Sequence, residues 1–458
     1  MIFEKIVSEG LAHNSYVIGS AGTAAVIDPR RDCGIYEDLA VREDVAITHI
    51  FETHRNEDYV IGSLELAART GARIYHGSHM EFTYGNPVAH GDAFSVGNLE
   101  LKVLETPGHT GESISIAVTD REMGDEVYMV FTGDALFAGD VGRTDFFGKA
   151  ETPRVAGALY DSIFRNLIPL GDGVVVCPAH GAGSVCGAHL TEHEFTTIGY
   201  EKKVNPALQK TREEFITHKM NEILYQPPYF KKMELYNKEG VPPLNGLPYS
   251  PPLNPREVDT RMKEHAQVLD VRNPASFSGG HIPGSYNIWK EGVPLFAGWV
   301  LTYDDPIIIV DEDTHTITDI LRYLVRIGYD SIGGHLAGGF ASWYMGGHPI
   351  NTISTWSVHD LRAALDTDIF LLDVRERHNW DHDGFITGAH QIYMGEVAGR
   401  LKDIPEEGHV VIYCDSGFKT GVAASILKKN GYERVTTVLG GMAAWKKAGY
   451  RVENPLES

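Results

Sequence analysis

The stretch that decides the fold is Val410-Val411-Ile412-Tyr413-Cys414-Asp415-Ser416-Gly417-Phe418-Lys419-Thr420-Gly421. A short β-branched run ends at a cysteine, and the polar loop that follows leads into a helical pattern that continues to Asn430. About 103 residues earlier, the run Ile307-Ile308-Ile309-Val310 precedes a matching loop in which Asp311 takes the place of Cys414. One copy of a repeated strand-loop-helix unit therefore carries a thiol, and the other lacks it.

Further anchors repeat in the same order along both copies. They are Leu269-Asp270-Val271-Arg272 with Leu372-Asp373-Val374-Arg375, Ile282-Pro283-Gly284 with Ile386-Thr387-Gly388, and residues 336–343 with residues 438–445. Within each copy, apolar strand-like runs alternate with helical stretches, which is typical of a parallel sheet covered on both faces. The sequence predicts tandem α/β domains at residues 256–350 and 355–458.

Cys414 lies in a loop between a strand and a helix, a position that favours a reactive thiolate. A loop between a strand and a helix points backbone N–H groups and the helix dipole at one spot, which stabilises an anion there. A thiolate or persulfide on Cys414 is such an anion, and we expect the charge of Lys419 to depress the thiol pKa. The alternative is a buried structural cysteine, which the polar residues around it disfavour.

The pattern Cys-x-x-Gly-x-Lys-Thr resembles the active-site loop of rhodanese sulfurtransferases. Related phosphatases place the basic residue six positions after the cysteine, whereas here Lys419 follows Cys414 by five, which favours sulfur transfer. The resemblance implies that residues 256–350 are an inactive copy and that Cys414 and Lys419 are catalytic. It also implies substrate contacts from the other loop residues: Asp415, Ser416, Gly417, Phe418 and Thr420. Most rhodaneses carry arginine at the position of Lys419, so the sulfur acceptor stays open.

Composition limits the possible functions. The chain has 458 residues, enough for three domains, and its formal net charge of −22 disfavours nucleic acid and anionic membranes as partners. No signal-peptide pattern or run of about 18 apolar residues is present, so we expect a cytoplasmic protein. Its four cysteines are too few for a disulfide framework. Clustered prolines at residues 226–255 predict a linker after an amino-terminal domain at residues 1–225.

In the amino-terminal domain, four β-rich runs each end in a potential metal ligand. These residues are His54, His109, Asp134 and His180. Their order and local sequences resemble the metallo-β-lactamase fold, an αββα sandwich with metals at one edge. The usual His-x-His-x-Asp-His loop of that family reads here His54-Arg55-Asn56-Glu57-Asp58-Tyr59. Asn56 and Tyr59 are poor replacements for imidazole, which disfavours a binuclear zinc site.

What remains is a triad of His54, His109 and Asp134. Two histidines and one carboxylate leave up to three coordination positions open, the arrangement expected for non-haem Fe(II) that binds both substrate and O₂. We expect one Fe(II) per chain, with Asp58 and His180 holding ligands or a water by hydrogen bonds.

The run Gly142-Arg143-Thr144-Asp145-Phe146 resembles that of the persulfide dioxygenases, the iron-dependent branch of this fold. The resemblance places Arg143 beside the substrate pocket; a structural ion pair between Arg143 and Asp145 is an equal alternative. It implies that a low-molecular-weight thiol persulfide and O₂ give the thiol and sulfite. Sulfite is also a common sulfur acceptor for rhodaneses and forms thiosulfate. The resemblance therefore covers the whole chain, as a fusion of a persulfide dioxygenase with rhodanese domains. It also implies a homo-oligomer.

Two other functions compete with this interpretation. One is a zinc-dependent, glyoxalase II-like thioester hydrolase fused to a sulfurtransferase, which Asn56 and Tyr59 disfavour. The other is a non-enzymatic persulfide sensor. For the remaining cysteines, packing is expected at Cys33 and Cys177, while Cys186 is either a packed residue or a second thiol for sulfur relay.

Overall fold

Four β-sheets organise the described residues, 1–182 and 195–454, of the computed structural model. Two six-stranded sheets belong to one compact unit, Met1–Leu247 with Val325–Gly328, and two five-stranded sheets belong to a second, Pro248–Leu324 with Tyr329–Ser458. None of the described helices is long and apolar enough to cross a membrane.

The first sheet of the amino-terminal unit has the order β1-β2-β3-β4-β5-β6. Its strands are β1 Ile2–Ser8, β2 His13–Ser20, β3 Thr23–Ile27, β4 Ala46–Phe51, β5 Arg73–Gly77 and β6 Asn86–Val88. The second sheet has the order β12-β11-β10-β9-β8-β7. Its strands are β7 Ala93–Val96, β8 Leu99–Glu105, β9 Ile114–Asp120, β10 Val127–Gly133, β11 Val175–Pro178 and β12 Thr196–Thr197. Both sheets mix antiparallel and parallel pairs.

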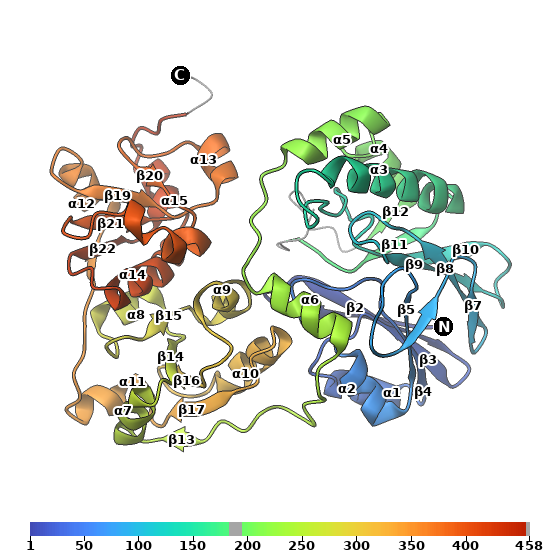
Figure 1. Ribbon diagram of the computed structural model, residues 1–458, viewed down its shortest axis with the longest axis horizontal. Helices are drawn as coiled ribbons and strands as arrows, with labels where there is room; N and C mark the ends of the chain where they lie inside the picture. Colours follow the sequence, from blue (N-terminus) through green and yellow to red (C-terminus); the bar gives the residue numbers. More distant parts are fainter. Residues whose placement is uncertain (183–194, 455–458) are drawn as a thin grey trace. The chain divides into compact units, whose positions relative to one another are not determined.

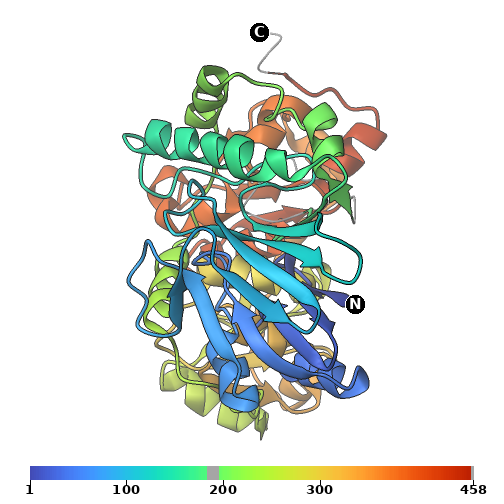
Figure 2. The same cartoon turned by 90° about the vertical axis from the view of Figure 1, so that its right-hand side faces the viewer.

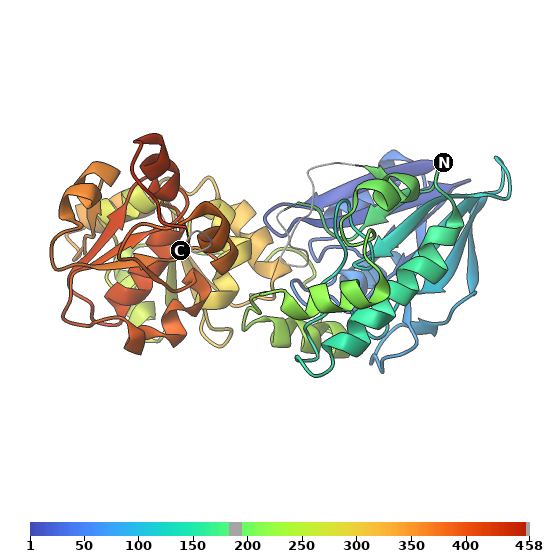
Figure 3. The same ribbon diagram turned by 90° about the horizontal axis from the view of Figure 1, so that it is seen from above.

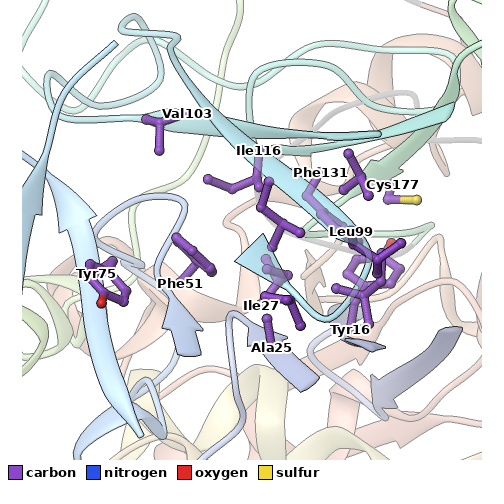
Figure 4. Packing of buried hydrophobic residues seen from close by; sticks show 14 of the residues in the cluster. Tyr16, Ala25, Ile27, Phe51, Tyr75, Leu99, Val103, Ile116, Phe131 and Cys177 are labelled. Atoms are coloured by element: carbon purple, nitrogen blue, oxygen red, sulfur yellow. The ribbon is translucent and has the colours of Figure 1, made fainter. Parts of the chain in front are cut away.

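The two sheets pack face to face around an apolar core. Figure 4 shows this core, in which Ile27 and Phe51 of the first sheet meet Ile116 and Phe131 of the second. Cys177 lies in the same core, as expected for a packing residue. Alternate residues of a strand point to opposite faces, so each sheet also presents an outer apolar face that needs a cover.

Helices cover both outer faces. They are α1 Gly34–Arg42 and α2 Ser63–Thr70 on the first sheet, and α3 Thr152–Ser162, α4 Ile198–Val204 and α5 Arg212–Asn221 on the second. Figure 2 shows α3 beyond the second sheet, and Figure 3 shows α3 and α5 side by side. Cys33 packs under the α1–α2 layer, again as expected. This layering is the predicted αββα sandwich.

The segment expected to be a linker contains a helix, α6 Phe230–Glu239. Its Phe230, Met233 and Asn237 are buried, and the amino-terminal unit extends to Leu247. Prolines stand on either side of α6 but outside it, and the helix itself ends at Gly240. The ten residues between them form an amphipathic helix that packs on the unit. Residues 226–247 are therefore part of the folded unit rather than a free connection.

The second unit repeats one topology twice. Its sheets have the orders β13-β17-β16-β14-β15 and β18-β22-β21-β19-β20, and all their strand pairs are parallel. The strands are β13 Pro252–Leu253, β14 Gln267–Asp270, β15 Tyr286–Asn287, β16 Ile307–Val310, β17 Ile332–Leu336, β18 Ser354–Trp356, β19 Phe370–Asp373, β20 His390–Gln391, β21 Val410–Tyr413 and β22 Val435–Val438. Corresponding strands occupy corresponding positions, so the tandem α/β prediction is confirmed.

Helices flank both parallel sheets, as Figure 1 shows. They are α7 Pro255–Lys263, α8 Pro274–Gly279, α9 Val293–Val300, α10 Ile317–Arg326 and α11 Gly339–Met345 in the first copy, and α12 Val358–Ala364, α13 Arg377–Asp383, α14 Lys419–Lys429 and α15 Gly441–Lys447 in the second. The central strands β16 and β21 are buried at every residue, because helices cover both of their faces. The repeated Asp-Val-Arg anchors form equivalent buried ion pairs, Asp270–Arg272 and Asp373–Arg375, each at 2.6 Å.

Candidate metal centre and sulfur-transfer loop

Three side chains converge at one edge of the sandwich, where strands β4, β8 and β10 end. His54, His109 and Asp134 are almost fully buried, and one ligand atom from each lies within 4.8 Å of the others. Asp134 Oδ2 is 3.7 Å from His54 Nε2 and 3.4 Å from His109 Nε2. None of these three atoms has a hydrogen-bond partner. Buried polar atoms are rarely left unpaired, so the arrangement fits a bound metal ion.

A hydrogen-bonded chain orients His54. The Thr53 hydroxyl donates to Asp28 Oδ2 at 2.6 Å, and its oxygen lies 2.9 Å from His54 Nδ1. Because the hydroxyl proton is used by Asp28, His54 Nδ1–H is the donor to Thr53 and Nε2 keeps its lone pair. Burial lowers the pKa of His54 to about 3, which keeps the ring neutral. Gly133 has φ +53°, and a Cβ there would lie 2.6 Å from Thr53 Oγ1. The hydrogen bonds of Thr53 therefore require a glycine at position 133.

His109 is oriented by a backbone group. Its Nδ1 lies 3.0 Å from the carbonyl oxygen of Arg143, which can only accept, so Nδ1 carries the proton and Nε2 faces Asp134. The Arg143 guanidinium forms a two-pronged ion pair with Asp145 at 2.8 Å and also donates to the Tyr225 carbonyl. The ion pair between Arg143 and Asp145, one of the two alternatives considered from the sequence, is therefore present. A substrate contact by Arg143 stays a prediction.

Asp134 is held by a histidine that lies between two carboxylates. His180 Nδ1 lies 2.8 Å from Asp134 Oδ1, and His180 Nε2 lies 3.0 Å from Asp58 Oδ2. Burial opposes the charge of His180, but the two carboxylates outweigh it and raise its pKa well above the ordinary value. Although burial alone would raise the pKa of Asp134, the histidines around it lower it. The structure thus brings Asp58 and His180 together around Asp134, leaving Oδ2 for a metal.

Asn56 and Tyr59, which stand where the His-x-His-x-Asp-His pattern has its two other histidines, make contacts of their own. The Tyr59 ring stacks on His13 with centroids 3.9 Å apart, and Asn56 Nδ2 donates to the His54 carbonyl. Together with the His180 bridge, these contacts leave one cluster of His, Cys, Asp and Glu side chains in the described residues that could hold a metal. The described residues therefore offer one candidate metal site.

Glu57 is a site residue that the sequence analysis missed. It is 1% exposed, and its Oε2 lies 3.6 Å from His109 Nε2 without a hydrogen-bond partner. Its other oxygen accepts from Arg55 at 3.0 Å. The signal was weak because Glu57 occupies a variable position of the His-x-His-x-Asp-His pattern. In the structure it adds a buried carboxylate beside the triad.

Helix α6 clamps the loop that carries these residues. Asn237 Nδ2 donates to the carbonyls of Asn56 at 2.6 Å and Tyr59 at 2.7 Å, and Asn237 Oδ1 accepts from Ile61 N at 2.9 Å. The Tyr229 hydroxyl donates to the Asp58 carbonyl at 3.2 Å. No sequence motif marked this contact, since the partners are separated by about 180 residues. The metal loop is thus held from a segment predicted to be a linker.

The Cys414 loop connects β21 to α14 in the second copy. Gly417 N–H donates to Cys414 Sγ at 3.1 Å, and Gly417 has φ +98°, which favours glycine. Thr420 supports the turn by donating its hydroxyl to the Gly417 carbonyl at 2.6 Å. Lys419 Nζ lies 3.1 Å from Asp415. The predicted loop residues are therefore gathered around the sulfur, while their contacts with substrate stay predictions.

The expectation that Lys419 lowers the Cys414 pKa is confirmed for the contribution of Lys419, but the net shift of the pKa is upward. Cys414 is 1% exposed, and burial raises its pKa above the ordinary value of 9. Lys419 lowers the pKa, but less than burial raises it, and Asp415 acts in the raising direction. The loop donors are in place, yet burial holds the pKa of the thiol above its ordinary value.

The equivalent loop of the first copy is closed on itself. Asp311 accepts a hydrogen bond from Glu312 N at 2.7 Å and another from the Thr316 hydroxyl. The Asp311 carboxylate therefore stands where the thiol stands in the second copy, and it is used up in hydrogen bonds within its own loop.

Cys186 lies outside the described residues, so the two interpretations of this cysteine stay open.

The chain matches two family descriptions. Residues 9–180 match the metallo-beta-lactamase superfamily, and residues 254–345 and 357–448 each match the rhodanese-like domain. A solved metallo-beta-lactamase of Staphylococcus aureus is 32% identical with a TM-score of 0.66, and the match covers 74% of this chain and 99% of that one.

Two curated relatives match the amino-terminal part. Persulfide dioxygenase ETHE1 of Bos taurus is 27% identical over 44% of this chain and 74% of its own length. Hydroxyacylglutathione hydrolase GloC of Haemophilus influenzae is 26% identical over 40% of this chain and 87% of its own length. With the αββα sandwich, its buried triad and the two parallel-sheet repeats, these matches show that the chain belongs to the metallo-beta-lactamase superfamily and joins that domain to two tandem rhodanese-like domains.

Proposed function

We propose that this protein is a non-haem Fe(II) persulfide dioxygenase coupled to a sulfurtransferase. The amino-terminal site oxidises a low-molecular-weight thiol persulfide, R-S-SH, with O₂ and water to R-SH and sulfite. The Cys414 site carries sulfur as a persulfide and exchanges it with sulfite or thiosulfate. Together the two reactions would remove sulfide-derived persulfides.

The observation that supports the proposal is the buried triad of His54, His109 and Asp134, with Asn56 and Tyr59 in place of the two other histidines of the pattern. His54, His109 and Asp134 would hold Fe(II), because two imidazoles and one carboxylate suit iron that must keep positions open. Bound there, Fe(II) would supply the one-electron chemistry that lets O₂ react with a sulfur anion. A hydrolytic zinc centre gains from more nitrogen ligands, which Asn56 and Tyr59 do not provide.

The chain's own residues keep this centre in order. Thr53 and the Arg143 carbonyl hold the Nδ1 protons of the two histidines, so that both Nε2 lone pairs face one point. His180 neutralises Asp134 Oδ1 and keeps Asp134 Oδ2 directed at the same point. Burial of all three ligands excludes bulk water, which limits side reactions of the sulfur anion.

The sulfur-transfer step uses Cys414. A Cys414 persulfide is attacked at its outer sulfur by sulfite, the bond between the two sulfurs breaks, and Sγ leaves as a thiolate while thiosulfate forms. Gly417 N–H lies where it can stabilise that thiolate, and Lys419 adds positive charge. Sulfite from the first site is thus a suitable acceptor for the second, and the reverse exchange uses the same residues.

The competing function is a zinc-dependent thioester hydrolase. The similarity to a hydroxyacylglutathione hydrolase of Haemophilus influenzae favours it, at 26% identity. Both functions use the same fold, so the metal and the second substrate distinguish them. The hydrolase needs zinc and water, whereas the dioxygenase needs iron and O₂.

The deciding experiment measures O₂ consumption by Fe(II)-loaded protein with a low-molecular-weight persulfide, with metal content quantified on the same sample. Uptake proportional to about one iron per chain is expected. Protein with stoichiometric zinc that cleaves an acylated thiol and consumes no O₂ would transfer the assignment to the hydrolase.

A further inference from the structure

An aromatic pair lies beside the Cys414 loop, and its two rings come from different rhodanese-like domains. Phe418, the last residue of the loop before α14, is 38% exposed, although it follows a fully buried cysteine by four positions. The Trp289 ring of the first domain lies against it, with ring centroids 5.3 Å apart and planes at 57°. The domain that lost its thiol therefore contributes a side chain at the edge of the other domain's loop.

Trp289 is anchored within its own domain. It lies two residues after the end of β15, and its ring lies 5.4 Å from the buried Phe296 of α9. A ring supported on one side by a core residue and on the other by Phe418 has little freedom to rotate. Trp289 is consequently a stable wall beside the loop rather than a mobile surface residue.

The two domains are docked closely at this point. A Cβ on Gly421, in the first turn of α14, would lie 2.2 Å from Asn287 Oδ1 and 2.9 Å from Pro274 Cβ. Asn287 cannot easily move, because its Nδ2 donates to the Asp270 and Arg272 carbonyls at 3.0 Å. Helix α14 therefore rests directly on β15 and α8, which fixes Trp289 relative to Phe418. Figure 1 shows these elements next to one another.

Charge at the loop does not explain affinity for the organic part of a substrate. The positive charge of Lys419 is paired with Asp415 at 3.1 Å, and Glu376 also acts on it electrostatically. The loop N–H groups and Lys419 can hold a compact anion such as sulfite, but they make no contact with the organic part of a larger substrate. Binding energy for a larger substrate has to come from apolar contact, and exposed aromatic surface is what the loop offers.

We propose that Trp289 and Phe418 form one wall of a subsite that binds the organic part of a thiol or thiol persulfide at Cys414. This deepens the proposed sulfurtransferase function by assigning a substrate class and a role for the first rhodanese-like domain. In the step concerned, R-S⁻ attacks the outer sulfur of the Cys414 persulfide. The original S–S bond breaks, Sγ leaves as a thiolate, and R-S-S⁻ is released, so no oxidant is needed.

The test compares acceptors of different size on a preformed Cys414 persulfide in the full-length protein. Trp289→Ala should lower kcat/KM for glutathione or coenzyme A about two- to tenfold, through KM, because one aromatic contact is lost. Discharge to cyanide, which has no organic body, should change less than about twofold. Trp289→Phe should restore most of the thiol kinetics.

Trp299→Ala is the matched control. Trp299 also bridges the two domains, since its ring lies 5.7 Å from Tyr393 and packs against Gly395. Among the described residues, these contacts lie away from the Cys414 loop. It should leave both acceptors unchanged. Equal losses with thiol and cyanide, unchanged thiol kinetics in Trp289→Ala, or the same thiol defect in Trp299→Ala would each overturn the subsite.

A binding measurement separates this proposal from the sulfurtransferase function itself. S-methylglutathione cannot accept sulfur, yet it should protect Cys414 of the native protein from iodoacetamide, with saturation, and protect Trp289→Ala about two- to tenfold more weakly. Protection in a protein without sulfur transfer would refute the function and retain the subsite. Sulfur transfer without any difference in protection would refute the subsite alone.

Discussion

Replacing Asn237 by alanine tests whether helix α6 holds the metal loop. The change removes the three buried hydrogen bonds between Asn237 and the backbone of Asn56, Tyr59 and Ile61, which measure 2.6, 2.7 and 2.9 Å. At about 1 kcal/mol net for each bond, the amino-terminal unit should lose roughly 3 kcal/mol of unfolding free energy. For a unit of this size, that loss corresponds to about 6–12 °C in Tm.

Metal affinity should fall as well, because His54 lies two residues before one of the released carbonyls. Loss of supporting contacts around metal ligands typically weakens binding by about 10- to 100-fold. Calorimetry of the metal-free protein would measure the thermal transition of this unit, and competition with a chelator would measure Fe(II) affinity. Leu235→Ala, on the same helix at a side chain that is 44% exposed, is the matched control. An Asn237→Ala protein with unchanged Tm and unchanged affinity would refute the clamp.

Four further predictions concern the two sites. His54→Ala or Asp134→Ala should abolish O₂ uptake and spare sulfur transfer, whereas Cys414→Ser should do the reverse; a folded variant that loses both activities would contradict the two-site scheme. Thr53→Val keeps the shape but removes the hydroxyl that orients His54, so Fe(II) affinity measured by chelator competition should fall about 10- to 100-fold, and unchanged affinity would count against the relay. Since burial raises the Cys414 pKa, site-resolved alkylation by iodoacetamide should rise about tenfold for each pH unit up to at least pH 9. Lys419→Ala removes a charge that lowers this pKa, so its profile should shift to higher pH and its rate at pH 8 should fall about three- to tenfold. A rate that levels off below pH 8 would show that the loop donors outweigh burial.

The fold was largely readable from the sequence because its signals are local and repeated. Every residue of β16 and β21 is apolar or aromatic and buried, and the Asp-Val-Arg anchors recur because each copy needs the same buried ion pair. The exception was α6, where flanking prolines concealed a helix whose stability comes from packing. Prolines show where a helix cannot continue, but they do not show whether the segment between two prolines forms a helix.

The metal triad was also predictable, since His54, His109 and Asp134 each stand just after a β-rich run. Strand ends at one edge of a sandwich meet in space, so three separate motifs implied one cluster. Glu57 and Asn237 were not predictable in this way. Glu57 stands at a variable position of the loop pattern, and Asn237 reaches the loop from about 180 residues away.

The sequence by itself determined the domain order, the duplicated sheets and the residue types at both candidate sites, because these properties depend on periodicity and on ligand chemistry within short stretches. Only the tertiary structure decided in which direction the Cys414 pKa is shifted, how His180 bridges two carboxylates, and that Trp289 stands beside Phe418. Burial and hydrogen-bond direction arise from neighbours brought together by packing, and those neighbours are distant in the chain.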